Sequence, residues 1–453
     1  MSEEQTKKKL RGNETTKKQI TTTNETFSDL PLDTMLKLYY QHIFPVKEMY
    51  DWLSIDDFLT KRNYFSRREF AFDTLKFRRH LSYSSPKDLQ NQLIQNHPFK
   101  IHVGPLYNTI PRDKHLVSVF TPVERELVFD IDLTDYDPVR TCCEGAKICT
   151  KCWTLMTVAI KVLDFILRRS FGFKHLLWVY SGRRGVHCWV CDTRARRLSE
   201  KSRAALASFI NIEVTKSGWV DLRHPMNPVI KKVYNEILVD YFEDLVVDQD
   251  FFGDQDQNKR SFLNKFSNNV LVLIRNSELR DRIQQRWTSQ NEEKSRWHIL
   301  KEELEYEQQN LKKKTNFYNR NDNYTKILQV IIFTTIYPRL DIGVSKKLNH
   351  LLKSPFSVHT GTENKKICIP INPKECDDFD PTDPKCVPTL IGVVNDLNNS
   401  KKNQNLNYNS TDLKKYVDMF VNDFLKPLRV QLEKEHKERI LARKKNVMDI
   451  ENF

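Results

Sequence analysis

The chain has 453 residues, of which 73 are lysine or arginine and 59 are aspartate or glutamate, so its formal net charge is +14. A hydrophobic content of 39% fits a globular protein of two or three domains, and the basic balance favours an anionic partner, either nucleic acid or nucleotide. The lysine-rich start lacks a signal-peptide core, and the longest apolar stretch, 153–167, is too short and too charged to span a membrane, so we expect an intracellular protein.

Local composition divides the chain into parts of different character. The predicted segments are a disordered tail at 1–26, a mixed α/β part at 27–212, a helical segment at 213–330, a second α/β part at 331–394, an Asn-rich flexible insertion at 395–410, and a C-terminal helix with a charged tail at 411–453. This order indicates one α/β domain with a helical subdomain inserted into it. Strand-like sequence is expected to return near Ile331 and to continue past Ile371. The last helix is expected to begin near Ser410 and to kink or break at Pro427.

A strictly alternating segment at 126–133, Glu-Leu-Val-Phe-Asp-Ile-Asp-Leu, predicts a strand with Asp130 and Asp132 on one face. Two carboxylates on one face repel each other, and a divalent cation such as Mg²⁺ or Mn²⁺ removes that repulsion. A metal pair held in this way activates an attacking hydroxyl and stabilises the leaving oxygen of a phosphoryl displacement. Taken alone, the motif is more often the exposed end of an edge strand, so its interpretation depends on its neighbours.

Four cysteines follow this strand in the pattern C-C-x5-C-x2-C, at Cys142, Cys143, Cys149 and Cys152. Four thiolates in so short a loop can close tetrahedrally around Zn²⁺, and a full set of protein ligands makes such a site structural rather than catalytic. The alternative is a group of ordinary buried cysteines. The other five cysteines are interpreted as ordinary thiols.

Two apolar strands at 176–180 and 186–190 flank the turn Ser-Gly-Arg-Arg-Gly, which predicts a β-hairpin. Its tip presents Ser181, Arg183 and Arg184, with His187 just beyond. Arginines offer fixed donor forks for phosphate oxygens, and glycines allow the backbone to approach closely, so the turn favours a triphosphate site. A generic basic hairpin is the alternative.

Further candidates lie beyond the helical segment. Asp341 is expected at the end of an extended segment that starts with the apolar run 331–336, and Ser345 is expected to cap the next helix. Lys353 and His359 follow. One carboxylate and two cations from a distant part of the chain could complete a metal and nucleotide pocket, although each residue also has an ordinary structural explanation.

Three runs, ELVFDID with the cysteine cluster, WVYSGRRGVHCWV and YPRLD…KSPFSVH, occur here in the order of one known family. Over about residues 33–360 the chain resembles the catalytic small subunit of eukaryotic and archaeal DNA primases. The resemblance implies an α+β primase fold of mixed β-sheets flanked by helices, with an inserted helical subdomain and a small zinc-binding loop. It also implies a DNA-directed RNA polymerase, a nucleotidyltransferase that starts short RNA primers on single-stranded DNA for replication initiation and lagging-strand synthesis.

The same resemblance assigns roles to individual residues. It implies that the ligands of catalytic Mg²⁺ or Mn²⁺ are Asp130, Asp132 and Asp341. It implies that structural Zn²⁺ is held by Cys142, Cys143, Cys149 and Cys152. It implies that the incoming NTP is bound by Ser181, Arg183, Arg184, His187, Lys353 and His359, with Arg339 in support. It further implies a nuclear protein that pairs with a large iron–sulfur primase subunit and with the catalytic and accessory subunits of DNA polymerase alpha.

One position departs from the family pattern. Members commonly carry an aspartate just before the Gly104 turn, where it contacts the nucleotide sugar, and this chain has His102. Sugar selection or initiation is therefore expected to differ. Glu69 and Arg78 fall near active-site positions of the family and are assigned as supporting residues.

Two other functions stay open at this stage. The first is a primase-like polymerase for repair or damage bypass, which would prefer dNTPs. The second is a non-catalytic, zinc-containing DNA-binding subunit, and the complete set of three aspartates argues against it.

Overall fold

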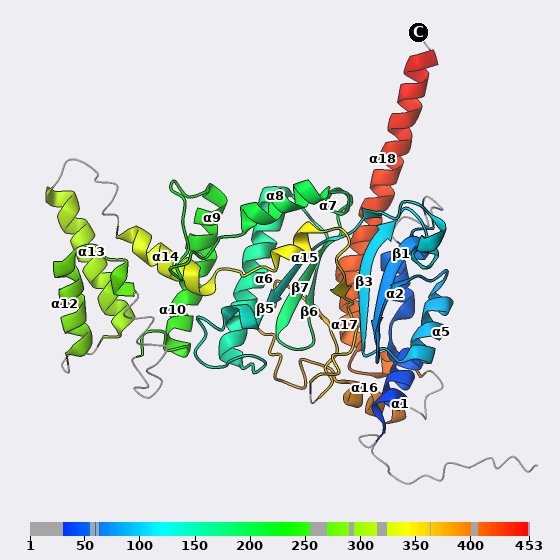
Figure 1. Cartoon of the computed structure of the whole chain (residues 1–453), viewed down its shortest axis with the longest axis horizontal. Helices are drawn as coiled ribbons and strands as arrows, with labels where there is room; N and C mark the ends of the chain where they lie inside the picture. The colour runs from blue at the N-terminus through cyan, green and yellow to red at the C-terminus, as the bar shows by residue number, and fades with distance from the viewer. Residues whose placement is uncertain are drawn as a thin grey trace, which may run out of the picture.

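The computed structural model describes residues 30–54, 59, 63–253, 270–289, 294–314, 324–362, 364–399 and 406–451. Two antiparallel β-sheets lie side by side with helices around them, and a helical arm extends from one end (Figure 1). The predicted tail at 1–26 lies outside these described residues. No helix in the described ranges is both long enough and apolar enough to cross a membrane.

The first sheet gathers the N-terminal strands in the order β2-β1-β3-β4, and β8 joins it from a distant part of the chain by pairing with β3. Its strands are β1 (Arg68–Asp73), β2 (Phe77–Leu81), β3 (Lys100–Tyr107), β4 (Pro122–Glu124) and β8 (Leu352–Lys353). The helices beside it are α1 (Leu32–Leu38), η2 (Tyr39–Ile43), α2 (Val46–Leu53), α4 (Tyr64–Arg67) and α5 (Pro86–Asn96) (Figure 1). The start of α5 follows from sequence, since the Ser85 side chain accepts a hydrogen bond from the Asp88 N–H and Pro86 occupies the first helical position.

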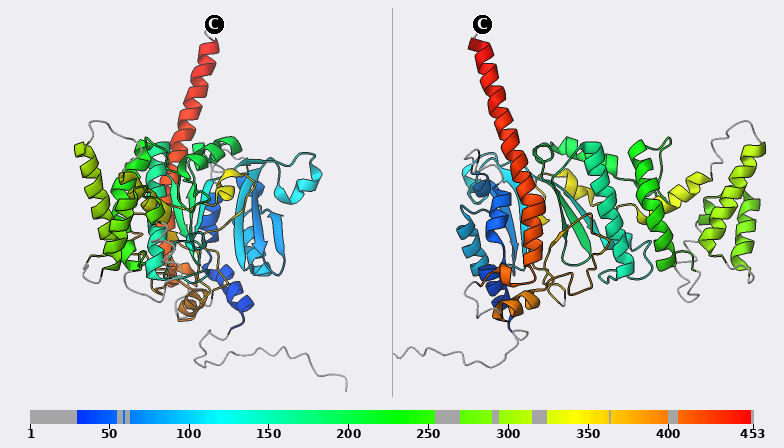
Figure 2. Two further views of the ribbon diagram at one scale, coloured as in Figure 1. Left: turned by 60° about the vertical axis from the view of Figure 1, so that its left-hand side comes forward. Right: turned by 180° about the vertical axis from the view of Figure 1, so that it is seen from behind.

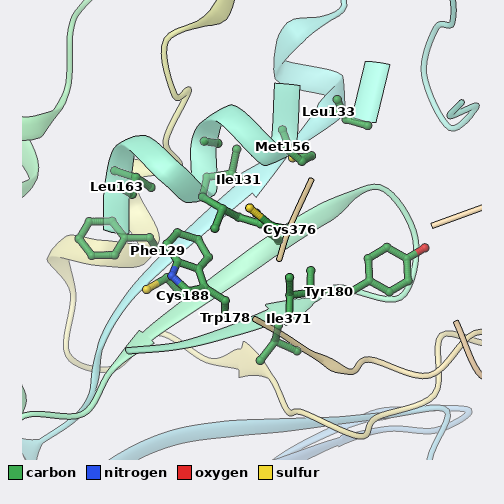
Figure 3. Close-up of a cluster of buried hydrophobic side chains, with 14 of the residues drawn as sticks. Phe129, Ile131, Leu133, Met156, Leu163, Trp178, Tyr180, Cys188, Ile371 and Cys376 are labelled. Atoms are coloured by element: carbon green, nitrogen blue, oxygen red, sulfur yellow. The ribbon is translucent and has the colours of Figure 1, made fainter. Parts of the chain in front are cut away.

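The second sheet has the carboxylate strand at its edge, in the order β5-β7-β6-β9. Its strands are β5 (Leu127–Asp132), β6 (Leu176–Tyr180), β7 (Gly185–Val190) and β9 (Pro370–Ile371). Helix α6 (Thr150–Phe171) packs on it, and Figure 3 shows Met156 and Leu163 of α6 gathered with Phe129, Ile131 and Trp178 of the strands. All five side chains are buried, so the apolar face of β5 is anchored while its aspartates face away.

A buried ion pair joins the two sheets. Arg68 of β1 donates two hydrogen bonds to Glu126, just before β5, at 2.8 and 3.0 Å, and a third to the Gly104 carbonyl at 3.1 Å. The two side chains are 0% and 1% exposed. Because loss of either partner would leave an uncompensated buried charge, this pair fixes the first sheet against the second.

The described residues between Arg196 and Ile336 are mostly helical. Its helices are α8 (Glu200–Ile210), α9 (Pro228–Val233), η5 (Tyr234–Leu238), α10 (Val239–Asp248), α12 (Ser277–Thr288), α13 (Arg296–Lys314) and α14 (Thr325–Ile336), after the short α7 (Thr193–Arg196). Helices α12 and α13 form the end of the molecule farthest from the first sheet (Figure 1). The strand predicted from Ile331 was wrong, because residues 331–336 complete α14. Isoleucine and threonine favour strands, but burial of this face against η5 and α6 stabilises the helix instead.

The C-terminal region also differs from expectation. Helix α16 (Leu390–Asn399) covers the first part of the predicted flexible insertion, and residues 400–405 lie outside the described ranges. A short turn, η8 (Tyr408–Ser410), precedes α17 (Lys414–Met419), η9 (Phe420–Leu425) and α18 (Lys426–Glu451), which follow one another without a gap, and the C-terminal part of α18 projects from the body (Figure 2). The predicted break at Pro427 was wrong, because the wide π turn η9 immediately before it accommodates the proline ring.

Candidate active site

The two aspartates of β5 face the hairpin formed by β6 and β7. Asp130 pairs in register with His187, and Asp132 pairs with Gly185. The pairing needs glycine there, since a Cβ on Gly185 would lie 2.3 Å from the Ile131 carbonyl oxygen. The hairpin is therefore held close enough for its side chains to reach both carboxylates.

Asp341 joins this pair from the other half of the chain. Its backbone N–H donates to the Asp130 carbonyl at 3.1 Å. Its carboxylate caps helix α15 (Ile342–Lys346) by accepting hydrogen bonds from the N–H groups of Gly343 and Val344, at 2.9 and 3.3 Å. The predicted cap, Ser345, lies inside α15 instead, and that prediction was wrong.

Burial together with neighbouring negative charge raises the pKa of Asp130 to about 7. Burial is the largest cause, followed by the charges of Asp132 and Asp341, and Lys353 opposes them. A carboxylate placed in this way is stabilised by a divalent cation, so the residues fit Mg²⁺ or Mn²⁺. The three carboxylates point to different partners here, however, and among the described residues only the cysteine cluster brings all its donor atoms within 4.8 Å.

The tip of the hairpin places basic side chains next to these carboxylates. Arg184 Nε donates to both carboxylate oxygens of Asp132 at 2.7 and 2.9 Å, and His187 Nε2 lies 3.5 Å from Asp130 Oδ1. The Ser181 hydroxyl accepts from the Gly185 N–H at 3.1 Å and stiffens the turn. Arg183 is half-buried at the tip.

Lys353 and His359 lie next to the turn of the hairpin. Lys353 Nζ donates to the Ser181 carbonyl at 2.8 Å, which brings β8 of the first sheet onto the hairpin of the second. A Cβ on Gly182, whose φ is +85°, would lie 2.8 Å from the His359 Cβ. Burial and the Lys353 charge lower the pKa values of His187 and His359, each to about 3. The Nδ1 atoms of both histidines are buried, and neither makes a hydrogen bond of good geometry to the described residues.

His102 lies next to Lys353, with which it pairs in register between β3 and β8. Burial, then the Lys353 charge, lowers its pKa to about 4, so the imidazole is neutral near pH 7. The half-exposed ring of Phe77 contacts it edge-on at 5.8 Å between centroids. The position that departs from the family pattern therefore places a neutral ring, in contact with Phe77, beside Lys353.

The supporting residues separate into two groups. Glu69 is fully buried and accepts hydrogen bonds from Arg79 Nε at 3.0 Å and from the Tyr107 hydroxyl at 3.1 Å. Arg79 also donates to the Asn349 carbonyl at 3.0 Å, so it bridges the first sheet to the segment after α15. Arg78 instead donates to Asn96, away from the carboxylates. Neighbouring residues on a strand face opposite sides of the sheet, so Arg78 and Arg79 cannot both face Glu69. Arg79 faces it and is therefore the better candidate for a supporting residue. This alternation was the signal in the sequence that could have identified it.

Arg339 shapes the turn that precedes Asp341. Its guanidinium donates to the carbonyls of Asp135 and Thr334, both at 2.9 Å, and lies 5.4 Å from the Tyr136 ring centroid. The same tyrosine hydroxyl accepts from the Arg339 N–H at 3.1 Å. These contacts support the approach of Asp341 to β5 without involving the carboxylate itself.

The four cysteines form a compact cluster, with all four sulfur atoms within 4.8 Å of one another. The Cys149 and Cys152 sulfurs are 3.9 Å apart, close to the roughly 3.8 Å that tetrahedral Zn–S bonds of about 2.3 Å impose. Hydrogen bonding from Cys142 lowers the pKa of Cys152 to about 5. The cluster therefore fits a zinc ion held by four thiolates.

Two hydrogen-bond donors to this cluster were not foreseen from sequence. Gln249, just after α10, donates to the Cys142 sulfur at 3.2 Å, and Arg140 donates to the Cys152 sulfur at 3.7 Å. Both side chains are buried. They supply the outer contacts that stabilise a negatively charged thiolate cluster, and Gln249 connects it to the helical segment.

A mixed α+β fold that sets three aspartates near Arg184, His187 and Lys353 is an arrangement typical of a nucleotidyltransferase. A sequence profile described as DNA primase small subunit matches residues 129–373. The DNA primase small subunit of Schizosaccharomyces pombe is 36% identical over 385 residues, covering 82% of this chain and 79% of the relative. The corresponding protein of Caenorhabditis elegans is 35% identical and covers 87% and 97%, and that of Pyrococcus furiosus is 31% identical over 35% and 48%. The chain belongs to the DNA primase small subunit family, which confirms the predicted resemblance and α+β fold class.

Proposed function

We propose that this protein is the catalytic subunit of a DNA primase that starts short RNA primers on single-stranded DNA, for the initiation of replication and for the lagging strand. The observation that carries the proposal is the approach of Asp132 and Asp341 to the buried Asp130, with Lys353 close by. Family membership supports primer synthesis as the reaction.

In the proposed mechanism, Asp130, Asp132 and Asp341 hold Mg²⁺ or Mn²⁺. Bound metal ions supply activation of the attacking hydroxyl and stabilisation of the leaving oxygen. Arg184, released from Asp132, turns its fork to the triphosphate. The buried Nδ1 atoms of His187 and His359 donate to phosphate oxygens, and the Lys353 ammonium offsets their charge. With Ser181 and Arg183, these residues bind and orient the NTP.

A replicative role leads to further proposals. We propose zinc as the metal of the cysteine cluster, a nuclear location, and assembly with a large iron–sulfur primase subunit and DNA polymerase alpha. The relatives' designation as small subunits supports the pairing with a large subunit. We also propose the catalytic domain at 27–212 and 331–394, with 213–330 as an inserted helical subdomain.

The direct test is primer synthesis with labelled NTPs on unprimed single-stranded DNA, with and without Mn²⁺. We expect metal-dependent products of a few nucleotides, and none from Asp130→Ala or Asp132→Ala. Full primer synthesis by both variants would refute the assignment of the carboxylates. A folded, template-binding protein that makes no product under any metal condition would favour the non-catalytic subunit.

A repair or bypass polymerase is kept as a second candidate because of His102, which presents a neutral ring beside Lys353 where family members commonly carry a carboxylate. The same assay distinguishes the two candidates if NTPs and dNTPs are offered separately. Preferential start with dNTPs on unprimed template would favour the second candidate, and preferential start with NTPs would favour the replicative primase.

A further inference from the structure

Strand β5 lies at an edge of its sheet, so its outward carbonyl groups need partners from elsewhere. The α15 segment supplies them. The Asp341 N–H donates to the Asp130 carbonyl at 3.1 Å, and the Ser345 hydroxyl donates to the Val128 carbonyl at 2.8 Å. Ser345 is fully buried. The helix that begins at the third carboxylate is thus fastened along the strand that carries the other two.

Arg125 fastens the far end of the same helix. Its Nη1 donates to the carbonyls of Val344 and Lys347 at 3.2 and 3.0 Å, where a helix leaves carbonyls unsatisfied. The arginine is 1% exposed. Its backbone is itself fixed, because its N–H donates to the Arg196 carbonyl and its carbonyl accepts from Arg203. Arg125 precedes β5 by two residues, so helix and strand share one anchoring point.

The geometry points to Ser345 and Arg125 as positioning residues for Asp341. Asp341 is the N-cap of α15, so any shift of this five-residue helix along the β5 edge moves its carboxylate relative to Asp130 and Asp132. Neither Ser345 nor Arg125 touches a carboxylate, and both act through the placement of the helix. The inference rests on the proposed function, in which the three aspartates hold divalent cations.

The test uses Ser345→Ala in the full chain, with Mn²⁺ alone as the probe and binding followed by electron paramagnetic resonance. We expect Mn²⁺ affinity to fall roughly 10-fold, as is typical when a contact that orients a metal ligand is lost. Primer synthesis should recover as Mn²⁺ is raised, while the KM for NTP at saturating Mn²⁺ stays unchanged.

Thr157→Val is the matched control. Thr157 is also buried, and its hydroxyl also donates to a backbone carbonyl, that of Cys376 at 3.3 Å, but it lies on helix α6 and not between α15 and β5. It should lose thermal stability to a similar extent without losing Mn²⁺ affinity. If Ser345→Ala does not fold, Arg125→Met replaces it in the same measurements, because methionine keeps a long side chain but has no donor for either carbonyl.

A double-variant comparison separates positioning from general weakening. If Ser345 acts through Asp341, then adding Ser345→Ala to Asp341→Asn should not lower Mn²⁺ affinity further. Normal Mn²⁺ affinity in Ser345→Ala, or an additive loss in the double variant, would overturn the inference. Normal affinity in Asp341→Asn alone would instead refute the proposed metal site, so the two failures can be told apart.

Discussion

Arg184 holds Asp132 with a single nitrogen, Nε, which lies 2.7 and 2.9 Å from the two carboxylate oxygens. An arginine therefore occupies a carboxylate that the proposed mechanism gives to a metal ion. In that mechanism the guanidinium and the metal would compete for Asp132 until a bound triphosphate provided the guanidinium with other acceptors.

This competition predicts opposite effects of Arg184→Ala on two ligands. The KM for NTP should rise roughly 10- to 100-fold, because charge-assisted hydrogen bonds to phosphate are lost. Mn²⁺ affinity in the absence of nucleotide should stay equal or increase, because Asp132 loses a competing cation. Arg183→Ala is the control and should raise the KM for NTP without changing Mn²⁺ affinity. Weaker Mn²⁺ binding in Arg184→Ala would contradict the competition.

Asp341→Asn should separate the two roles of this side chain. Asparagine is also a good N-cap, so the hydrogen bonds to Gly343 and Val344 can persist and the melting temperature should change little. Primer synthesis should fall on the order of 100-fold or more, because a charge that stabilises the transition state through the metal is lost. Asp135→Asn, a nearby carboxylate outside the triad, should keep most activity. Equal losses in both variants would show that Asp341 has no special role.

Cys149→Ser should lower the stability of the fold more than it lowers the rate of primer synthesis. Removing one of four thiolates opens the cluster, and a structural metal contributes directly to folding free energy. We expect the bound zinc to be lost and the melting temperature to fall by at least about 5 °C. The control is Cys386→Ser, outside the cluster, which should keep both zinc and stability. A folded and active wild-type protein that contains no zinc by elemental analysis would refute the metal assignment.

His102 should leave a signature in the pH dependence of folding. Its pKa in the folded protein is about 4, below the unfolded value of about 6.5, so between these values the unfolded chain binds a proton that the folded chain does not. The stability contributed is present above pH 6.5 and is lost as pH falls toward 4. In urea unfolding experiments, the free energy of unfolding should fall less steeply with decreasing pH for His102→Gln than for wild type. The exposed-site control His115→Gln should behave like wild type. An unchanged slope would contradict the assignment.

Regular local patterns predicted the elements that carry the site. Alternation gave β5, and two apolar runs around a glycine turn gave the hairpin of β6 and β7. The spacing of four cysteines within eleven residues predicted a cluster, and the sulfur atoms do lie together. These features depend on neighbours in the chain, where sequence carries a direct signal.

Features that depend on tertiary contacts were not predicted. Residues 331–336 have the β-branched composition of a strand, but their burial among other helices makes them the end of α14. Ser345 and Arg125 bind backbone carbonyl groups. Every residue has such a group, so the sequence does not indicate which residues are the partners. Gln249 donates a hydrogen bond to Cys142, but the local sequence around Gln249 indicates only the end of a helix.

Because α15 covers the edge of β5, this strand edge can acquire its native partners only late in the synthesis of the chain. Asp130 and Asp132 leave the ribosome about two hundred residues before the segment that covers their strand, which at roughly 5–20 residues per second is an interval on the order of 10–40 s. Throughout that interval the edge carbonyls of β5 have no native partner from residues 341–345. The nascent chain therefore presents an open strand edge, a surface on which other strands can pair, until nearly all of the domain has been made.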